Sequence, residues 1–122
     1  MSWRLRLAPL REASGAPIED YFGAAVAPPG HSLAGQVFVT DRDAFPSQTG
    51  AIWRVDPGTG GATLVSSGGF FLELHDVPFD ASGDLIATDV YSDSLIRVNP
   101  STGAQQKAWA CDLAAPAGGP PR

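Results

Sequence analysis

The chain contains an internal repeat. Residues 54–60 read Arg-Val-Asp-Pro-Gly-Thr-Gly, and residues 97–103 read Arg-Val-Asn-Pro-Ser-Thr-Gly, at an offset of 43. Upstream of each motif, residues 35–41 (Gly-Gln-Val-Phe-Val-Thr-Asp) match residues 83–89 (Gly-Asp-Leu-Ile-Ala-Thr-Asp) at an offset of 48, because the first copy has five more residues between its two motifs. A period of this length indicates two copies of one supersecondary unit.

Each copy is predicted to contain four short antiparallel strands. We expect them at residues 22–27, 36–41, 51–56 and 62–66 in the first copy, and at 75–80, 84–88, 94–99 and 104–110 in the second. Asp56 and Asn99 each begin a Pro-x-Thr-Gly turn, in which Pro presets φ and the last Gly takes a left-handed conformation. A repeated unit of four strands favours the β-propeller blade over a sandwich or an up-and-down barrel, since neither alternative requires such a repeat.

The predicted fold is therefore all-β, with two four-stranded antiparallel propeller-type blades that form an incomplete propeller. The first blade spans residues 21–67 and the second spans residues 68–110. The irregular N-terminal lead, residues 1–20, and the Gly/Pro-rich C-terminal tail, residues 111–122, follow no repeat. The tail is expected to be disordered, because such a composition buries little apolar surface.

The two copies resemble an NHL-type repeat. The residues that carry this resemblance are the glycine turn and apolar strand of residues 83–89, the Leu-Ile-Arg-Val-Asn-Pro-Ser-Thr-Gly run of residues 95–103, and His-Asp-Val-Pro-Phe-Asp at residues 75–80. The chain is thus similar to NHL-type and streptogramin-lyase-like propellers over about residues 21–110. The resemblance implies a ring of about six blades, of which this chain supplies two. Fewer than three repeats are usually unstable alone, so we expect self-association, completion of a partner, or a marginally folded fragment.

The charge and hydropathy argue against some classes of partner. The net charge is −5, although Arg4, Arg6 and Arg11 lie in the first eleven residues, so the rest of the chain is strongly acidic. An acidic body argues against nucleic acid, whose phosphates are bound mainly by Lys and Arg. No apolar stretch is long enough for a signal peptide or a transmembrane helix, which predicts no membrane partner and a cytoplasmic location if the chain is full-length. Cys111 is the single cysteine, which excludes an intrachain disulfide.

The sharpest candidates for catalysis are His75 and Asp76, which open the expected innermost strand of the second copy. The resemblance implies a divalent metal (Ca, Mg or Zn) near a central channel, held by side chains from several blades. Asp41 and Asp89, at the ends of equivalent strands, are further candidate metal ligands. One blade supplies only part of the three-ligand set of a catalytic zinc. We favour a structural role for these residues over a metal site. In this interpretation His75 caps a strand, and Asp41 and Asp89 accept backbone N–H groups.

Other side chains are expected to have structural roles. Arg54 and Arg97 recur at equivalent positions, where a cross-strand partner is favoured over an anion site. Trp53 is expected to pack between blades. The apolar residues of 70–74 are expected to form inter-blade core, or else an exposed docking patch.

The favoured function is a non-catalytic propeller repeat module that binds protein, peptide or glycan, because the repeat is present and the metal site is incomplete. The alternative is part of a metal-dependent propeller enzyme similar to a lyase or a lactonase, to which His75 and Asp76 contribute. A third hypothesis is a truncated propeller fragment. No cofactor other than that divalent metal is suggested by the residues.

Overall fold

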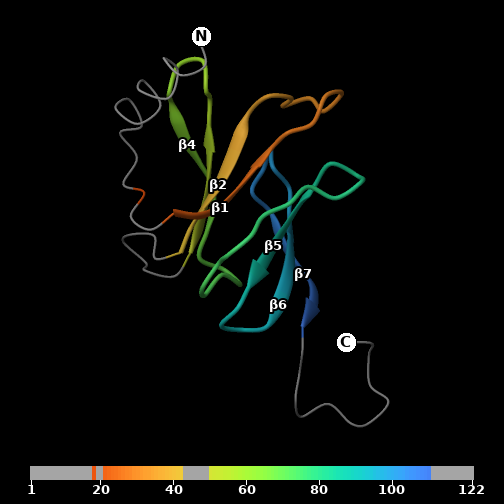
Figure 1. Cartoon of the computed structure of the whole chain (residues 1–122). Coiled ribbons are helices and arrows are strands. Elements are labelled where there is room, and N and C mark those ends of the chain that lie inside the picture. Colours follow the sequence, from red (N-terminus) through yellow and green to blue (C-terminus); the bar gives the residue numbers. More distant parts are fainter. Residues whose placement is uncertain (1–17, 19–20, 43–49, 111–122) are drawn as a thin grey trace, which may run out of the picture.

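The computed structural model describes Ile18, residues 21–42 and residues 50–110 (Figure 1). Within these ranges the chain forms seven β-strands and no helix. The strands make two antiparallel sheets, a four-stranded first sheet in the order β1-β2-β3-β4 and a three-stranded second sheet in the order β5-β6-β7. The all-β prediction is confirmed for the described residues. Apart from Ile18, the predicted lead and tail lie outside them.

Each sheet is built from hairpins between strands that are neighbours in the sequence. The strands are β1 (Tyr21–Val26), β2 (Val37–Asp41), β3 (Ala51–Val55), β4 (Ala62–Ser67), β5 (Leu85–Asp89), β6 (Ser94–Val98) and β7 (Gln105–Ala110). Seven of the eight predicted strands are therefore present, each within one residue of its predicted bounds. The periodicity and the turn residues were sufficient to place these elements.

The eighth predicted strand, residues 75–80, is not formed as a regular strand, so the prediction of a second four-stranded unit was wrong in this element. The segment still runs antiparallel to β5. The backbone N–H of Ile86 donates to the Pro78 carbonyl at 2.7 Å, but only two isolated bridges form, Leu74 with Asp89 and Phe79 with Leu85.

Two features of the segment interrupt its ladder. Pro78 has no N–H to donate. In addition, His75 and Asp76 both lie opposite Thr88, because the His75 N–H donates to the Thr88 carbonyl and the Thr88 N–H donates to the Asp76 carbonyl, each at 2.9 Å. Two residues opposite one break the regular alternation of antiparallel pairing, as in a β-bulge. β1 has a register shift against β2 at the equivalent place, between Tyr21 and Ala24, so Pro78 is the feature that distinguishes the second segment from β1.

The two sheets share irregular features as well as regular ones. The register shifts between Ile52 and Trp53 in the β3–β4 pair, and between Leu95 and Ile96 in the β6–β7 pair, at positions equivalent in the repeat. The two repeats of the sequence therefore share the same irregularity of the backbone as well as the same strands.

A threonine hydroxyl holds the first segment of each sheet in chain order. The backbone N–H of Gly23 donates to Oγ1 of Thr40 at 2.8 Å, and that of Asp76 donates to Oγ1 of Thr88 at 2.9 Å. Gly23 and Asp76 are thus equivalent positions, and so are their preceding residues, Phe22 and His75. Although residues 75–80 form no regular strand, they occupy the place in the second sheet that β1 occupies in the first.

The Pro-x-Thr-Gly turns have the predicted chemistry. Gly60 and Gly103 both adopt φ of +79°, and their N–H groups donate to the carbonyls of Asp56 and Asn99 at 2.7 and 2.8 Å. The side-chain oxygen of Asp56 accepts the N–H of Gly58, and that of Asn99 accepts two N–H groups of its own turn. Left-handed φ explains why glycine ends both turns.

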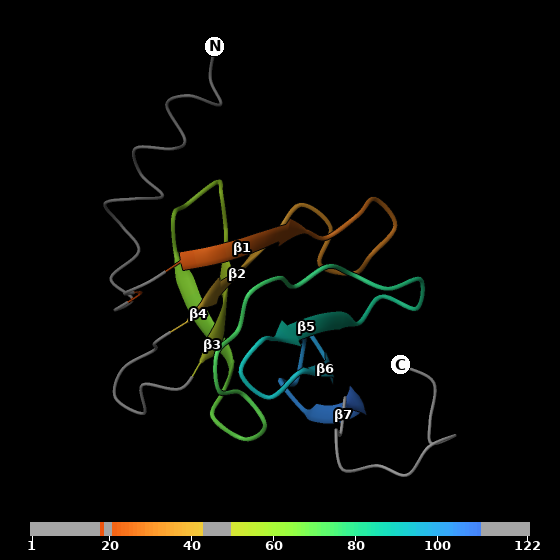
Figure 2. The same cartoon turned by 60° about the horizontal axis from the view of Figure 1, so that its bottom comes forward.

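The hydrophobic core lies between the two sheets, which sit side by side (Figure 2). The first sheet contributes Phe38 and Ile52, and the second contributes apolar side chains of β5 and β6. The connection between the sheets adds Phe71 and Leu74, whereas Phe70 and Leu72 are 43% exposed. The predicted apolar cluster of residues 70–74 is therefore divided between the core and the surface.

Candidate binding groove

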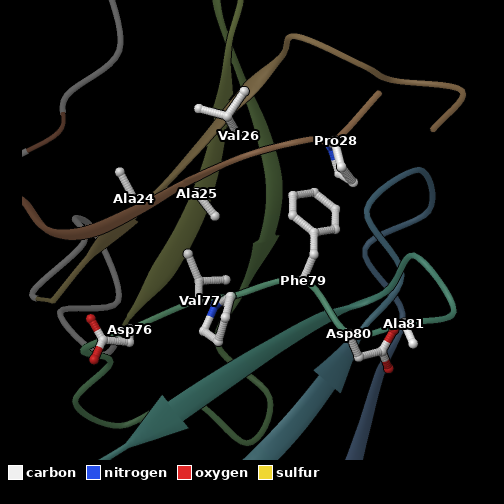
Figure 3. Close-up of a pocket in the computed structure, with 10 residues that line it drawn as sticks. Ala24, Ala25, Val26, Pro28, Asp76, Val77, Phe79, Asp80 and Ala81 are labelled. Carbon is white, nitrogen blue, oxygen red and sulfur yellow. The ribbon is translucent and has the colours of Figure 1, made fainter. Parts of the chain in front are cut away.

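A groove runs between β1 of the first sheet and residues 76–81, which precede β5 of the second sheet (Figure 3). It has a volume of about 670 Å³, with β1 and Pro28 on one side and residues 76–81 on the other. Val77 and Phe79 point from the second segment toward β1. Val77 is fully buried, and the Phe79 ring packs edge-on against Phe38 at 5.4 Å between centroids. The groove therefore has an apolar floor fixed to the core.

The β1 side of the groove is the edge of the first sheet. The N–H of Ala27 donates to the Gln36 carbonyl at 2.9 Å, so Ala27 belongs to a hydrogen-bonded pair at the end of the β1–β2 ladder. Antiparallel ladders alternate, which directs the backbone groups of Ala24 and Val26 away from β2. No backbone hydrogen bond joins these groups to another described segment. The Val26 side chain is 59% exposed.

Carboxylates mark the two ends of the groove (Figure 3). Asp80 accepts the Ser82 hydroxyl at 2.8 Å and lies 3.4 Å from the Arg97 guanidinium. The Ser82 hydroxyl, helped by backbone N–H groups and Arg97, lowers the pKa of Asp80 against a smaller opposing effect of desolvation. Asp76 is exposed, and among the described residues no hydrogen bond or ion pair engages its carboxylate. The negative charge available to a ligand is therefore that of Asp76.

His75 lies in a small cluster next to the Asp76 end of the groove. Its ring contacts the Phe22 ring at 3.9 Å between centroids, with the two planes tilted by 55°, so the equivalent residues of the two copies are in contact. Its Nε2 is 3.7 Å from a carboxylate oxygen of Glu73, and it is buried with no hydrogen-bond partner among the described residues. Glu73 also lies 3.8 Å from Arg42, whose guanidinium carbon is 5.4 Å from the centre of the Phe22 ring.

Asp89 and Asp41 are buried at the ends of β5 and β2. Asp89 accepts four backbone N–H groups, from Leu72 and Glu73 before β5 and from Tyr91 and Ser92 after it, at 2.6 to 3.1 Å. Burial raises the pKa of Asp89, but these hydrogen bonds together lower it by more, so the pKa lies below its usual value. Asp89 thus joins two loops, which is the structural role predicted as the alternative for it.

The predicted metal ligands do not come together. Among the described residues, no three His, Cys, Asp or Glu side chains are placed to hold one metal ion. The Asp89 oxygens are occupied by backbone donors. Next to His75 lies the Glu73 carboxylate, whereas a catalytic zinc needs three protein ligands. The described residues therefore do not fit the divalent metal that the resemblance implies.

His31 forms a contact between the two copies that its local sequence does not predict. Its Nδ1 accepts the N–H of Leu33 at 2.9 Å, and its Nε2 contacts the Gly83 carbonyl at 2.8 Å, which requires the neutral imidazole with its hydrogen on Nε2. His31 and Gly83 are 52 residues apart, so no local pattern pairs them. The ion pair of Arg42 with Glu73 was missed for the same reason.

No family model matches the chain, and neither a curated protein nor a solved structure matches it. In the described ranges, no helix has the length and hydropathy needed to cross a bilayer.

Proposed function

We propose that the chain is a non-catalytic β-propeller repeat module of the NHL type that binds an extended peptide along the edge of β1. In this proposal the two sheets are propeller blades, and β1 and residues 74–80 are their innermost segments. Three observations support the proposal. The two sheets have register shifts at equivalent positions, and in each sheet a threonine hydroxyl, of Thr40 or Thr88, accepts a backbone N–H of the first segment. A groove also lies between these two segments.

The observation that carries the proposal is the edge of β1 beside an apolar groove. Backbone groups of Ala24 and Val26 are directed away from β2, and Val77 and Phe79 form the floor beside them. An extended peptide binds such an edge by adding a strand, with backbone hydrogen bonds providing affinity and alternate side chains entering pockets. The groove thus offers both parts of this recognition mode.

The charge of the groove indicates the chemistry of the peptide. Asp76 carries a negative charge with no described partner, whereas Asp80 is partly neutralised by Arg97. The apolar floor accepts a small or branched apolar side chain near Val26 and Phe79. The favoured ligand is therefore an extended segment in which apolar residues alternate with others, with a basic residue near the Asp76 end.

The proposal is tested by selecting random octapeptides displayed on phage against the purified chain, followed by calorimetric titration of the best synthetic peptide. Ala24→Pro removes an N–H on the groove side, and an edge strand tolerates proline at such a position. We expect this variant to lose about tenfold in affinity, the equivalent of one backbone hydrogen bond. Asp76→Asn is expected to lose severalfold at low salt and little at high salt.

The matched control is Asp93→Asn, because Asp93 is an exposed carboxylate outside the groove, and Asn tolerates its φ of +52°. This control should bind the peptide as the unmodified chain does. If no peptide is enriched, if the chain binds a glycan array but no peptide, or if Ala24→Pro leaves affinity unchanged while its circular dichroism stays native, the proposal is contradicted.

A further inference from the structure

The second sheet has one face that the first sheet does not cover. Leu85, Ala87 and Asp89 face the first sheet and are buried, so the alternating residues Ile86 and Thr88 lie on the opposite face. Leu95 pairs directly with Thr88 and therefore shares that face. We call Ile86, Thr88 and Leu95 the open face. All three side chains are partly exposed.

The same face of the first sheet is covered. The residues equivalent to the open face are Phe38, Thr40 and Ile52, and each is 0% exposed. The second sheet covers them with Leu85, Ala87, Ile96 and Val98, which are also 0% exposed. The equivalent faces of the two sheets thus differ in exposure. The face of the first sheet is buried by the second sheet, whereas the open face of the second sheet is partly exposed.

The first sheet carries its own version of the covering surface. The residues equivalent to Leu85, Ala87 and Ile96 are Val37, Val39 and Trp53. They lie on the face of the first sheet opposite to Phe38 and Thr40, because Val39 pairs directly with Trp53. We call them the covering face. They are half-buried, whereas their equivalents in the second sheet have no exposed surface.

We infer that the open face of one copy of this chain binds the covering face of a second copy, head to tail, and repeats the contact that joins the two sheets within the chain. We infer a second copy as the partner for the following reason. Within the chain, one face of the second sheet buries Phe38, Thr40 and Ile52, and the equivalent face of the first sheet is the covering face. A second copy therefore provides the matching surface for the open face. This interface uses the faces of the two sheets and the start of β1, whereas the proposed peptide adds to the edge of β1 at Ala24 and Val26, so the inference does not depend on peptide binding.

Polar details of the internal contact have counterparts at the new interface. The Thr40 hydroxyl donates to the His75 carbonyl of the second sheet at 2.6 Å. At the new interface, the Thr88 hydroxyl is placed to donate to the Phe22 carbonyl of the second copy, since Phe22 is equivalent to His75.

The turn glycine of the second sheet takes part in the internal contact. Gly103 approaches β4 so closely that a Cβ there would overlap the Val65 carbonyl oxygen. One contact is not repeated: Ser66 accepts a hydrogen bond from Gln105 and donates one to Gly103, and its equivalent is Trp109. Apolar contact replaces these hydrogen bonds at that position.

The closure of such contacts into a ring rests on the proposed function, in which the two sheets are propeller blades. A head-to-tail contact is heterologous, and it closes when its rotation divides a full turn. β-Propellers close with about four to eight sheets. A chain with two sheets therefore closes as two, three or four copies, with β1 of every copy facing the ring axis.

The test uses light scattering coupled to size exclusion on the full chain. The unmodified chain is expected to have two, three or four times its 12.7 kDa mass. Leu95→Arg blocks the open face and Val39→Arg blocks the covering face, so each variant alone should be a folded monomer. An equimolar mixture of the two should form a two-chain species and nothing larger, because one complete interface remains between them.

The matched control is Leu72→Arg, since Leu72 is 43% exposed and lies on neither face. This variant should keep the mass of the unmodified chain. If circular dichroism shows that either variant is unfolded, Ile86→Arg and Val37→Arg take the same roles.

Three outcomes would overturn the inference. The first is a folded monomer for the unmodified chain at every accessible concentration. The second is a Val39→Arg variant that still dimerises by itself, which would indicate two open faces in contact. The third is a mixture of the two folded variants that stays monomeric.

Discussion

The two sheets have the same backbone plan but differ in their first segment and in their neighbours. In the first sheet this segment is the strand β1, which pairs with β2 with one register shift between Tyr21 and Ala24, whereas residues 74–80 form only isolated bridges in the second sheet. Positions that are identical in both copies, such as Thr40 and Thr88, hold the backbone. At a position that differs, where the first copy has Gly23, the second copy has Asp76, whose carboxylate lies at one end of the groove. In this chain, the differences between the copies are a better guide to a site than the residues that recur.

The largest expected effect concerns Asp89, which holds both loops around β5. Asp89→Ala leaves four backbone N–H groups without their acceptor, and we expect a loss of about 3 kcal/mol or more in the free energy of unfolding. Urea unfolding followed by circular dichroism measures it. Asp76→Ala is the control, since its exposed carboxylate has no described partner. Equal stability of the two variants would show that the loops do not depend on Asp89.

The same carboxylate predicts a dependence of stability on pH. The pKa of Asp89 is lowered in the folded chain, so the unfolded chain binds its proton first as the pH falls. The stability that Asp89 contributes is complete above its unfolded pKa, near 3.8, and is lost as the pH falls through the lower folded value. Urea midpoints from pH 6 to pH 2 should fall less steeply in Asp89→Asn. Parallel curves for the two proteins would contradict the assignment.

Alanine substitutions at two glycines with left-handed φ distinguish the cost of backbone strain from the cost of steric overlap. Gly103→Ala places a Cβ against the Val65 carbonyl, whereas Gly30, with φ of +92°, has nothing within 4 Å of an added Cβ. We expect about 1 kcal/mol of destabilisation for Gly30→Ala, from its backbone conformation alone. Gly103→Ala should cost at least about twice as much, because the sheets must also move apart. Similar unfolding midpoints would show that β4 and the Gly103 turn are not in close contact.

Thr40 and Thr88 are equivalent residues in different surroundings, since Thr40 lies at the junction of the two sheets and Thr88 lies on the open face. Both accept an N–H within their own sheet, but only Thr40 also donates across to the second sheet. Thr40→Val should lose about 2 kcal/mol, and Thr88→Val about 1 kcal/mol, in a monomeric background such as Leu95→Arg. If Thr88→Val is equally costly there, the comparison fails.

The smallest effect is expected at Trp53, whose Nε1 is buried with no hydrogen-bond partner in the part of the chain that the structure describes. The equivalent residue of the second sheet is Ile96, which has no polar atom to satisfy. Trp53→Phe removes the unpaired donor and some apolar area, so the two effects oppose one another. We expect a change within about 1 kcal/mol in thermal unfolding. A much larger loss would indicate that the indole N–H has a partner.

Local patterns predicted most of the fold and little of the site. Turn residues such as Pro57 and Gly60 fix hairpins whose strands are neighbours in sequence, so the strands were placed within one residue. Pro78 was visible in the sequence, but its consequence depended on which backbone groups face β5. The contacts of His31 with Gly83 and of Arg42 with Glu73 are set by how the sheets pack. No residue period encodes that packing.

The distance along the chain between contacting residues bears on the order of folding. The hairpins within each sheet join neighbouring strands, while the Thr40–His75 and His31–Gly83 hydrogen bonds span 35 and 52 residues. Closing a longer loop costs more chain entropy and slows the step that requires it. We expect the hairpins to form first and the docking of the two sheets to limit the folding rate. Substitutions at Thr40 should therefore alter the unfolding rate more than the rate of hairpin formation.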